Sequence, residues 1–501
     1  MGFFEAGLAM ALTIGVAGLA WRKWGWLTCR LQTLPGGSRF FAHLDRILTR
    51  RALARFPAVI AALVLDALLL RRVWRNTTHW RAPRWARHMA LFYGFLGLTV
   101  FHAMDGVVTR PLFTASEPVQ DPWQLLRDAL GLVALAGLLL LAARRVLDER
   151  LRALTRAQDW ALLLLVGAIL ASGVALESAK LLSPRVFQRM LTDYAFIDDP
   201  DDLRALRAWW VADQGAWLPG VDAPAQGLVA RGAEVNADNC AVCHSDTASA
   251  VAARPLAALL RPVAPRMALS NAQAFLWYLH LGACFLALAL LPWGKFVHVF
   301  LTPVNLARRG LRPGSDLPAK SRGELGPAEA LAQAMGMDAC TRCGECSLRC
   351  SVRPIHTVLG TAEILPSEKL LAQRAHLRGT PLTGRALEAF SEGSRICTEC
   401  LRCTLVCPAG IDLQALWLAG KRGLAGPGEV LRTLAPDTLA DILGRAAPDN
   451  PPSAAEREQG DGLADRPRSF RGCVQCTTCT SVCPVVAVSD DPTRDLDLTP
   501  Q

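Results

Sequence analysis

Hydrophobic residues are concentrated in roughly the first 300 positions of the chain, where they form runs long enough to cross a lipid bilayer. A transmembrane helix takes about 20 predominantly apolar residues. Five segments meet this length, near residues 4–26, 87–108, 124–143, 159–182 and 272–297. The remainder is polar and is interrupted by proline and glycine. The pattern predicts an all-α membrane protein with a five-helix transmembrane bundle, followed by a soluble, mostly helical domain.

A sixth apolar run, FPAVIAALVLDALLL at 56–70, is shorter than the length of about 20 residues that a transmembrane helix takes. It contains Asp66 and has basic residues on both sides. Runs of this length are more typical of interfacial or core helices than of spans. We interpret it as an amphipathic helix on the membrane surface, with a sixth span as the alternative.

The distribution of arginine favours five spans. The stretches 22–87 and 143–156 are rich in arginine, whereas 107–121 has a single basic residue. Positively charged loops stay on the cytoplasmic side of a membrane. Five spans place both arginine-rich stretches inside, whereas a sixth span would place residues 22–55 outside. Residues 183–271 are then outside, and the chain after about residue 300 is cytoplasmic.

The net charge of +10 raises the possibility of a nucleic-acid partner. The basic residues cluster beside apolar spans, where they orient membrane helices, so we expect membrane lipid and no nucleic acid as the partner. The first 26 residues have the length of a signal peptide, but their basic residues follow the apolar run instead of preceding it. We interpret them as a first membrane helix.

Four histidines fall in the second and last predicted spans: His88, His102, His280 and His298. In an α-helix the first two are about 40° from alignment and the last two are aligned, so each pair shares one helix face. Because the two spans run in opposite directions, His102 and His280 come level near the outer side, and His88 and His298 near the inner side. The pattern predicts bis-histidine ligation of two b-type haems. The alternative is that each histidine hydrogen-bonds to a neighbouring helix or is solvated, but ionisable residues inside membranes are usually functional.

The segment GAEVNADNCAVCH carries the Cys-x-x-Cys-His spacing of covalent haem c attachment. Cys240 and Cys243 would form the thioether bonds, and His244 would bind the iron. A zinc site or a chance match is the alternative, but the segment 183–271 has no further Cys or His to complete four zinc ligands. Met267, which follows the motif, is the predicted sixth ligand of the iron. This attachment takes place in the bacterial periplasm, which agrees with an outer location.

Three runs share the spacing C-x-x-C-x-x-C-x-x-x-C, in which three thiolates bind one [4Fe–4S] cluster and the fourth reaches a neighbouring cluster. The first two runs therefore pair reciprocally. One predicted ligand set is Cys340, Cys343, Cys346 and Cys407, and the other is Cys397, Cys400, Cys403 and Cys350. Structural zinc is the alternative, but zinc ribbons use paired Cys-x-x-Cys knuckles.

A third run comprises Cys473, Cys476, Cys479 and Cys483 and follows a polar linker. With no fourth run to pair with, it is predicted to bind its own cluster, to complete a site with a partner, or to dock elsewhere. We expect two or three clusters in all.

The membrane half resembles the gamma subunit of respiratory nitrate reductase and its relatives in heterodisulfide reductase complexes. The stretch RWARHMALFYGFLGLTVFHAMDG (84–106) carries this resemblance. The soluble half resembles the C subunit of heterodisulfide reductase, through CPAGIDLQALWLAGKRG (407–423). The resemblance implies five-span dihaem cytochromes b, electron exchange with quinol or quinone, and a cytoplasmic partner that carries the catalytic site. The haem c segment and the third cysteine run depart from both families.

These observations predict a membrane-bound electron-transfer subunit of a respiratory oxidoreductase complex in the bacterial inner membrane. Its electrons would pass between the quinone pool, or a periplasmic cytochrome, and cytoplasmic iron–sulfur partners. A redox sensor of the quinone pool and a zinc-stabilised membrane anchor are the alternatives. The predicted parts are a membrane module (1–182), a periplasmic cytochrome c-like insertion (183–271), the last transmembrane helix (272–300), a linker (301–325), a dicluster ferredoxin-like domain (326–435), a flexible linker (436–471) and the third iron–sulfur motif with the tail (472–501).

Overall fold

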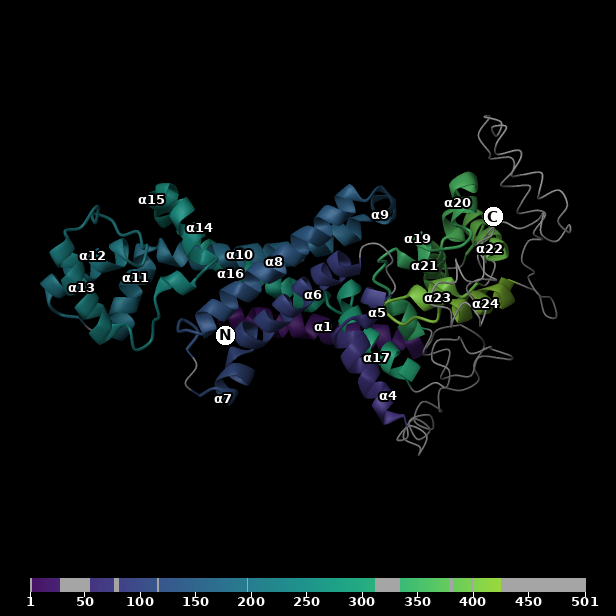
Figure 1. Cartoon of the computed structure of the whole chain (residues 1–501), viewed down its shortest axis with the longest axis horizontal. Helices are drawn as coiled ribbons and strands as arrows, with labels where there is room; N and C mark the ends of the chain where they lie inside the picture. Colours follow the sequence, from purple (N-terminus) through teal and green to yellow (C-terminus); the bar gives the residue numbers. More distant parts are fainter. Residues whose placement is uncertain are drawn as a thin grey trace, which may run out of the picture. The chain divides into compact units, whose positions relative to one another are not determined.

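The computed structural model describes residues 2–27, 55–75, 81–114, 117–195, 197–310, 334–377, 382–397 and 400–424. Every regular element in these ranges is a helix (Figure 1). The chain divides into two compact units, Met1–Gly15 with Trp80–Leu290, and Val16–His79 with Leu291–Gln501. The predicted linker at 436–471 and the third cysteine run at 473–483 lie outside the described residues.

Within the described ranges, four helices are long and apolar enough to cross a membrane. They are α1 (Phe3–Leu27, over Phe3–Arg22), α8 (Trp123–Leu147), α10 (Ala157–Leu181) and α16 (Ala272–Leu290). A bent pair, Pro83–Ala103 followed by Asp105–Leu112 at 74°, brings the number to five if it is one span. The chain is therefore a multi-pass membrane protein, built from helices throughout the described ranges.

The bend lies where the second predicted span changes from α-helix to π-helix. Helix α6 (Arg81–Leu98) continues as the π-turn η2 (Thr99–Ala103), and Met104 N donates to Thr99 O at 2.8 Å. A second π-turn, η3 (Asp105–Thr109), and α7 (Arg110–Leu112) follow. A π-turn contains more residues than an α-turn. The prediction that His88 and His102 are related by a regular α-helix is therefore wrong from Thr99 onward.

Glycines allow α6 and α8 to pack closely in the first unit. A Cβ on Gly94 would lie 2.7 Å from Ala134 N, and one on Gly137 would lie 2.5 Å from Leu91 N. Small residues at such crossings let membrane helices approach backbone to backbone. Helix α10 packs on α8 and α16 in the same unit.

The last predicted span ends earlier than expected. Helix α16 stops at Leu290, and the chain turns through Pro292 and Gly294 before η7 (Lys295–Val297) and α17 (His298–Gly310). Proline lacks an N–H for the helix ladder, and Gly294 is extended. The prediction that His280 and His298 share one continuous helix is therefore wrong. The predicted linker at 301–325 is also wrong in its first part, because α17 continues to Gly310.

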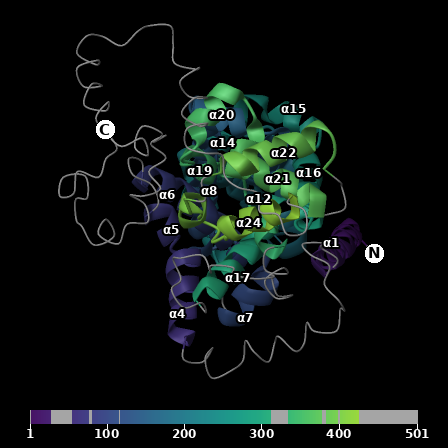
Figure 2. The same cartoon turned by 90° about the vertical axis from the view of Figure 1, so that its right-hand side faces the viewer.

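The short apolar run forms α4 (Phe56–Ala61) and η1 (Ala62–Leu68), followed by α5 (Arg71–Arg75). It is shorter than a span, and α17 packs against it (Figure 2). Asp66 accepts two hydrogen bonds from Arg71, at 2.7 and 3.1 Å. Its location on the membrane surface stays a prediction.

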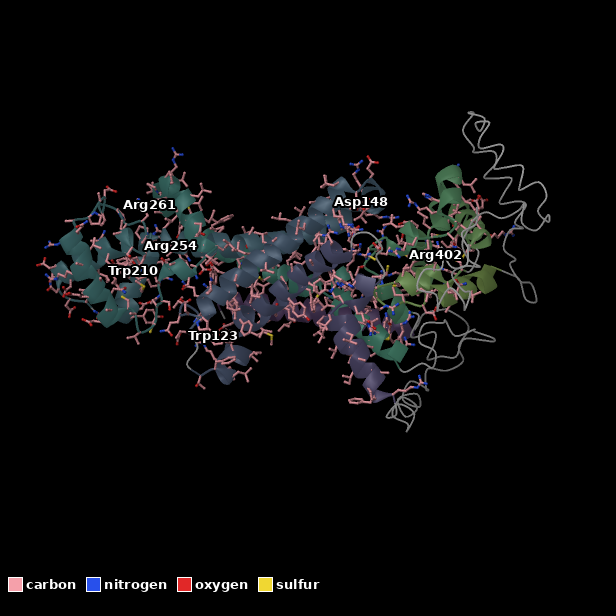
Figure 3. All side chains as sticks on the ribbon, in the orientation of Figure 1. Trp123, Asp148, Trp210, Arg254, Arg261 and Arg402 are labelled. Atoms are coloured by element: carbon pink, nitrogen blue, oxygen red, sulfur yellow. The ribbon has the colours of Figure 1, made fainter. Side chains whose placement is uncertain are left out.

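Residues 183–271 form a helical lobe of the first unit. Its helices are α11 (Pro184–Met190), η4 (Leu191–Ala195), α12 (Pro200–Ala212), α13 (Gln226–Asn239), α14 (Ala253–Leu260) and α15 (Ala264–Leu269). Helices α12 and α13 cross so closely at Gly232 that a Cβ there would overlap Ala205 O. In Figure 3 the lobe, marked by Trp210 and Arg254, lies at the end of the first unit where α8 begins at Trp123, and Asp148 lies beyond the opposite end of α8.

Among its described residues, the second unit also has the 3₁₀ turn η8 (Ala362–Ile364) and several short α-helices, packed around a core that includes Trp417, Leu416 and Met337. These helices are α19 (Glu345–Leu348), α20 (Arg353–Leu359), α21 (Pro366–Leu377), α22 (Arg385–Ile396), α23 (Arg402–Val406) and α24 (Leu413–Leu424). The described cysteines of the first two runs lie in the loops and helix ends between them.

Candidate metal centres

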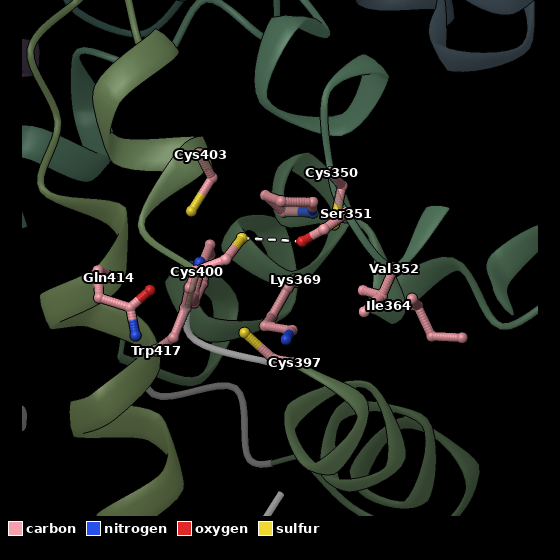
Figure 4. A pocket seen from close by; sticks show the side chains of 11 residues that line it. Cys350, Ser351, Val352, Ile364, Lys369, Cys397, Cys400, Cys403, Gln414 and Trp417 are labelled. Carbon is pink, nitrogen blue, oxygen red and sulfur yellow. Dashed lines mark hydrogen bonds between the residues drawn. The ribbon is translucent and has the colours of Figure 1, made fainter. Parts of the chain in front are cut away.

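Four cysteines line one cavity of about 350 Å³ in the second unit (Figure 4). They are Cys350, Cys397, Cys400 and Cys403. Apart from the cysteines, the wall includes Lys369 and Trp417. The structure thus brings together the four residues that the reciprocal spacing predicts for one cluster, although they come from two separate runs.

The other four cysteines of these runs form a second group: Cys340, Cys343, Cys346 and Cys407. The pKa shifts of these thiols indicate that the four cysteines lie close together. Burial raises the pKa of Cys340 to about 12, and the neighbouring Cys407 and Cys343 add to the rise. Burial raises the pKa of Cys346 well above its ordinary value, and the neighbouring Cys343, Cys340, Cys407 and Cys403 add to the rise. Thiols of this kind are protonated at neutral pH, and they become thiolates when a metal supplies compensating positive charge.

The two cysteine loops share a backbone conformation at equivalent positions. The residue after the second cysteine is Gly344 in one loop and Leu401 in the other, and both are left-handed, at φ 79° and φ 63°. Glycine adopts this conformation freely, whereas leucine pays a strain energy of about 1–3 kcal/mol. Strain of this kind is typical of functional sites. The fold therefore imposes one loop geometry on two different sequences.

The segment around His298 packs directly on the first cysteine loop. Lys295 Nζ donates to Thr341 O at 3.1 Å, next to Cys340. Val297 and Leu301, which flank His298, belong to the same buried core as Cys407. His298 Nδ1 hydrogen-bonds to Lys295 O at 2.6 Å. With Nδ1 engaged, Nε2 is the ring nitrogen available to a metal.

Arg72 contacts the same group of cysteines from another element. Its guanidinium donates to Cys407 O at 3.3 Å and to Leu405 O at 3.1 Å. The sequence analysis missed this residue, because nothing in the composition of 56–75 indicates a partner more than 300 positions away.

The outer histidine pair lies within the first unit. His102 and His280 are close enough for their charges to interact. His280 Nδ1 lies 3.1 Å from Ile169 O and 3.1 Å from Ser172 Oγ, and its Nε2 lies 3.9 Å from Cys284 Sγ. A backbone carbonyl on Nδ1 fixes the ring and leaves Nε2 as the potential ligand atom. The structure thus brings the predicted outer pair together. His88 lies in α6 of the first unit and His298 begins α17 of the second, so the inner pair stays a prediction from sequence.

A charged cluster accompanies the outer pair, and the sequence analysis missed it. Arg127 forms an ion pair with Glu177, and the neighbouring Asp128 accepts hydrogen bonds from Ala252 N and Ala253 N. Arg127 and Lys180 are close enough to His102 to act on it electrostatically. Ionisable groups at this depth in a membrane helix pair with one another and mark functional sites.

The Cys-x-x-Cys-His motif follows directly on α13. Cys240 is buried, and the N–H groups of Cys243 and His244 donate to Cys240 O at 3.0 and 2.9 Å. The Trp210 ring meets the His244 ring edge to face, with centroids 6.1 Å apart. Burial lowers the pKa of His244, which favours the neutral imidazole that binds metals.

The loop that contains this motif is docked on the start of α8. Ser245 N donates to Val119 O at 3.1 Å, and Asp121 N donates to Ser245 Oγ at 2.9 Å. Gln120 also donates to Val242 O. The predicted haem c site is therefore held against the start of α8, the helix that also carries Arg127.

Met267 lies apart from this motif. It packs against Leu182, Ala257 and Trp217 and lines a cavity of about 220 Å³ with Ser183 and Asn271. Across the described residues, no three His, Cys, Asp or Glu side chains are arranged to hold a single metal ion.

Two segments of the chain match known families. Residues 85–196 match the nitrate reductase gamma subunit, and residues 335–411 match the 4Fe–4S dicluster domain. The first match includes His88 and His102, and the second includes the first two cysteine runs.

Similar curated proteins are described as the D subunit of dihydromethanophenazine:CoB--CoM heterodisulfide reductase. The protein from Methanosarcina mazei is 34% identical over 108 residues, which are 19% of this chain and 26% of that protein. The proteins from Methanosarcina acetivorans and Methanosarcina barkeri are each 31% identical over the same shares. The match thus spans about a quarter of these relatives, which are D subunits, whereas the sequence resemblance pointed to the C subunit. No solved structure matches. The chain therefore joins a nitrate reductase gamma-like domain to a 4Fe–4S dicluster domain, similar to the D subunit of heterodisulfide reductase, in one multi-pass membrane protein.

Proposed function

We propose that this chain is the membrane electron-transfer subunit of a respiratory oxidoreductase complex. It would exchange electrons between the quinone pool, or a periplasmic donor, and cytoplasmic iron–sulfur partners. The sites would follow one another from the Cys240–His244 motif through the outer and inner histidine pairs to the two cysteine groups. In a bacterial inner membrane, residues 183–271 would be periplasmic and residues 301–501 cytoplasmic.

The packing of the His298 segment on the first cysteine loop is the observation that carries this proposal. Lys295 lies three residues before His298 and donates to the carbonyl beside Cys340. Val297 and Leu301 bury apolar surface in the same core as Cys407. This contact is partly buried and lies within one compact unit. It gives a histidine of the membrane half and thiols of the soluble half a common framework.

The residues of each site fit the groups proposed for them. Sets of four buried or half-buried thiols suit [4Fe–4S] clusters, and His280 and His298, whose Nδ1 faces a backbone carbonyl, suit haem iron. The clusters and haems would supply one-electron redox chemistry when bound. For the inner haem, we retain His88 and His298 as the proposed pair from the sequence.

We assign proton exchange with quinol to the charged cluster beside the outer pair. Oxidation of a quinol releases protons together with electrons. Glu177 is a half-buried carboxylate that pairs with Arg127, and Arg127 in turn lies close enough to His102 to act on it electrostatically. Glu177 can accept a proton and pass it to the neighbouring polar groups at the start of α8.

The test uses the full-length protein purified in detergent. A pyridine-haemochrome assay is expected to show two extractable haems and one covalent haem, and EPR two or three cubane clusters. Rapid mixing with a quinol analogue should reduce the haems first and the clusters afterwards. Lys295→Met should slow only the second phase, whereas Arg204→Gln, an exposed change in the outer lobe, should leave both phases unchanged.

A colourless protein would overturn the proposal and favour a structural membrane anchor. Cofactors that are present but never reduced by quinol or by a periplasmic cytochrome would also contradict it.

A further inference from the structure

The outer lobe contains a second methionine that could bind the iron of the predicted haem c. Its place in the sequence, before the Cys-x-x-Cys-His motif, does not indicate this role. The lobe has two methionines, Met190 before the Cys-x-x-Cys-His motif and Met267 after it. The structure separates them into two hydrophobic clusters, and only one of these clusters contains a residue of the motif.

Met190 packs against the cluster that contains Cys240. The buried members of this cluster also include Phe187, Leu191 and Leu206. Met267 packs instead against Leu182 and Ala257, toward the end of α10. A sixth ligand has to come from the side chains around the attachment cysteine, and Met190 is the methionine that packs against that cluster.

A chain of aromatic contacts links Met190 to the proposed proximal histidine. Phe187 and Met190 are three residues apart in α11 and so lie on one face of the helix. The Phe187 ring lies 5.7 Å from the Trp210 ring, and the Trp210 ring lies 6.1 Å from the His244 ring. The helix face that carries Met190 thus borders the aromatic wall on which His244 rests.

The same wall contains an unsatisfied polar atom. Trp210 Nε1 is buried without a hydrogen-bond partner, although buried indole N–H groups usually have one. The carboxylates on the edge of a haem would provide an acceptor there. The unpaired indole N–H, the attachment cysteine and the proximal histidine are all groups that a haem bound here would use.

We propose that Met190 is the sixth ligand of the haem iron attached at Cys240 and Cys243. This inference rests on the proposed function, since it requires the covalent haem. The methionine thioether is unbranched and adaptable, so it can reach an iron from the end of a short helix. The ligand would then precede the attachment motif in the chain, and α12 and α13 would lie between them in sequence.

The test is optical and magnetic spectroscopy of the full-length oxidised protein. Methionine-ligated ferric haem has a long-wavelength sulfur-to-iron charge-transfer band, which bis-histidine haems lack. We expect this band in the unsubstituted protein, its loss in Met190→Leu and its retention in Met267→Leu. In the reduced state, carbon monoxide should bind one haem of Met190→Leu and none of Met267→Leu.

A second variant covers the case in which Met190→Leu fails to mature. Met190→His offers the iron an imidazole, so the sulfur band should disappear while the haem stays low-spin. Persistence of the band in either Met190 variant, or its loss in Met267→Leu, would overturn the assignment. An unsubstituted protein with covalent haem but no sulfur band would overturn it too. A protein without covalent haem in the pyridine-haemochrome assay would instead refute the haem c part of the proposed function.

Discussion

A buried lysine should set the reduction potential of one cluster. Lys369 is 1% exposed and lines the cavity of Cys350, Cys397 and Cys400. Its ammonium donates to Gly393 O at 2.7 Å and lies 5.4 Å from the Trp417 ring centroid. Burial raises the pKa of Cys350 to about 12, and the charge of Lys369 opposes this rise. The lysine therefore stabilises negative charge in the cavity.

The magnitude follows from Coulomb's law. Reduction adds one negative charge to a cluster, so removal of a nearby positive charge lowers its potential. At a separation of roughly 8 Å and an effective dielectric constant of about 20, the interaction is about 2 kcal/mol. For a one-electron couple this corresponds to about 90 mV. We expect Lys369→Met to lower the midpoint potential of this cluster by that order.

The assay is an EPR-monitored redox titration, with iron and acid-labile sulfide measured to confirm full cluster content. Lys369→Arg keeps the charge and should restore most of the potential. Arg385→Met removes an exposed charge of the same domain, where solvent and salt screen its effect, so it should change the potential little. A shift in Lys369→Met no larger than in Arg385→Met would refute the reasoning.

The remaining predictions concern assembly and pH. Cys350→Ser should remove the EPR signal of one cluster and leave that of the other, and simultaneous loss of both would contradict two separate ligand sets. Gly232→Val should prevent the outer lobe from folding, since the side chain would overlap Ala205 O and overpacking costs about 1–3 kcal/mol or more; haem staining of denaturing gels would show reduced covalent haem. In protein stripped of iron, burial raises the pKa of Cys340 to about 12 from an unfolded value of about 8.5. The folded thiol then binds its proton more tightly than the unfolded one. The free energy of unfolding of the apo-protein should therefore be highest below about pH 8.5 and should fall between about pH 8.5 and about pH 12. Denaturant titrations that coincide at about pH 7 and about pH 10 would contradict this prediction.

The sequence predicted the parts of the molecule that depend on local pattern. Helices α8 and α10 match their predicted spans within a few residues at each end, because apolar length alone defines a span. The grouping of Cys350 with the second cysteine run also agrees with the spacing argument. A span is predicted from one apolar stretch, and the cysteine grouping is predicted from the same spacing repeated in two separate runs.

The sequence failed where backbone breaks or distant packing decide the structure. The π-turn at Thr99–Ala103 has no compositional signal, and the helix break after Leu290 could have been read from Pro292 and Gly294. Lys369 and Arg72 were missed because their roles depend on residues far along the chain. Chain order favoured Met267 as the sixth haem ligand, whereas packing favours Met190.

The first cysteine loop is fixed by charged residues from several elements of the second unit. Asp338, two residues before Cys340, pairs with Arg22 at 2.7 Å and with Arg374 at 2.8 Å. Arg22 Nε also donates to Pro292 O at 2.6 Å, in the turn that follows α16. Buried ion pairs contribute little net stability because desolvation offsets their attraction, but they define relative position. The helix break at Pro292 leaves the Pro292 carbonyl available to the Arg22 guanidinium. The same guanidinium pairs with Asp338, so Arg22 connects the His298 segment to the Cys340 loop. Electron transfer depends on fixed distances between sites more than on thermodynamic stability. The contacts of Arg22 and Asp338 help to fix these distances.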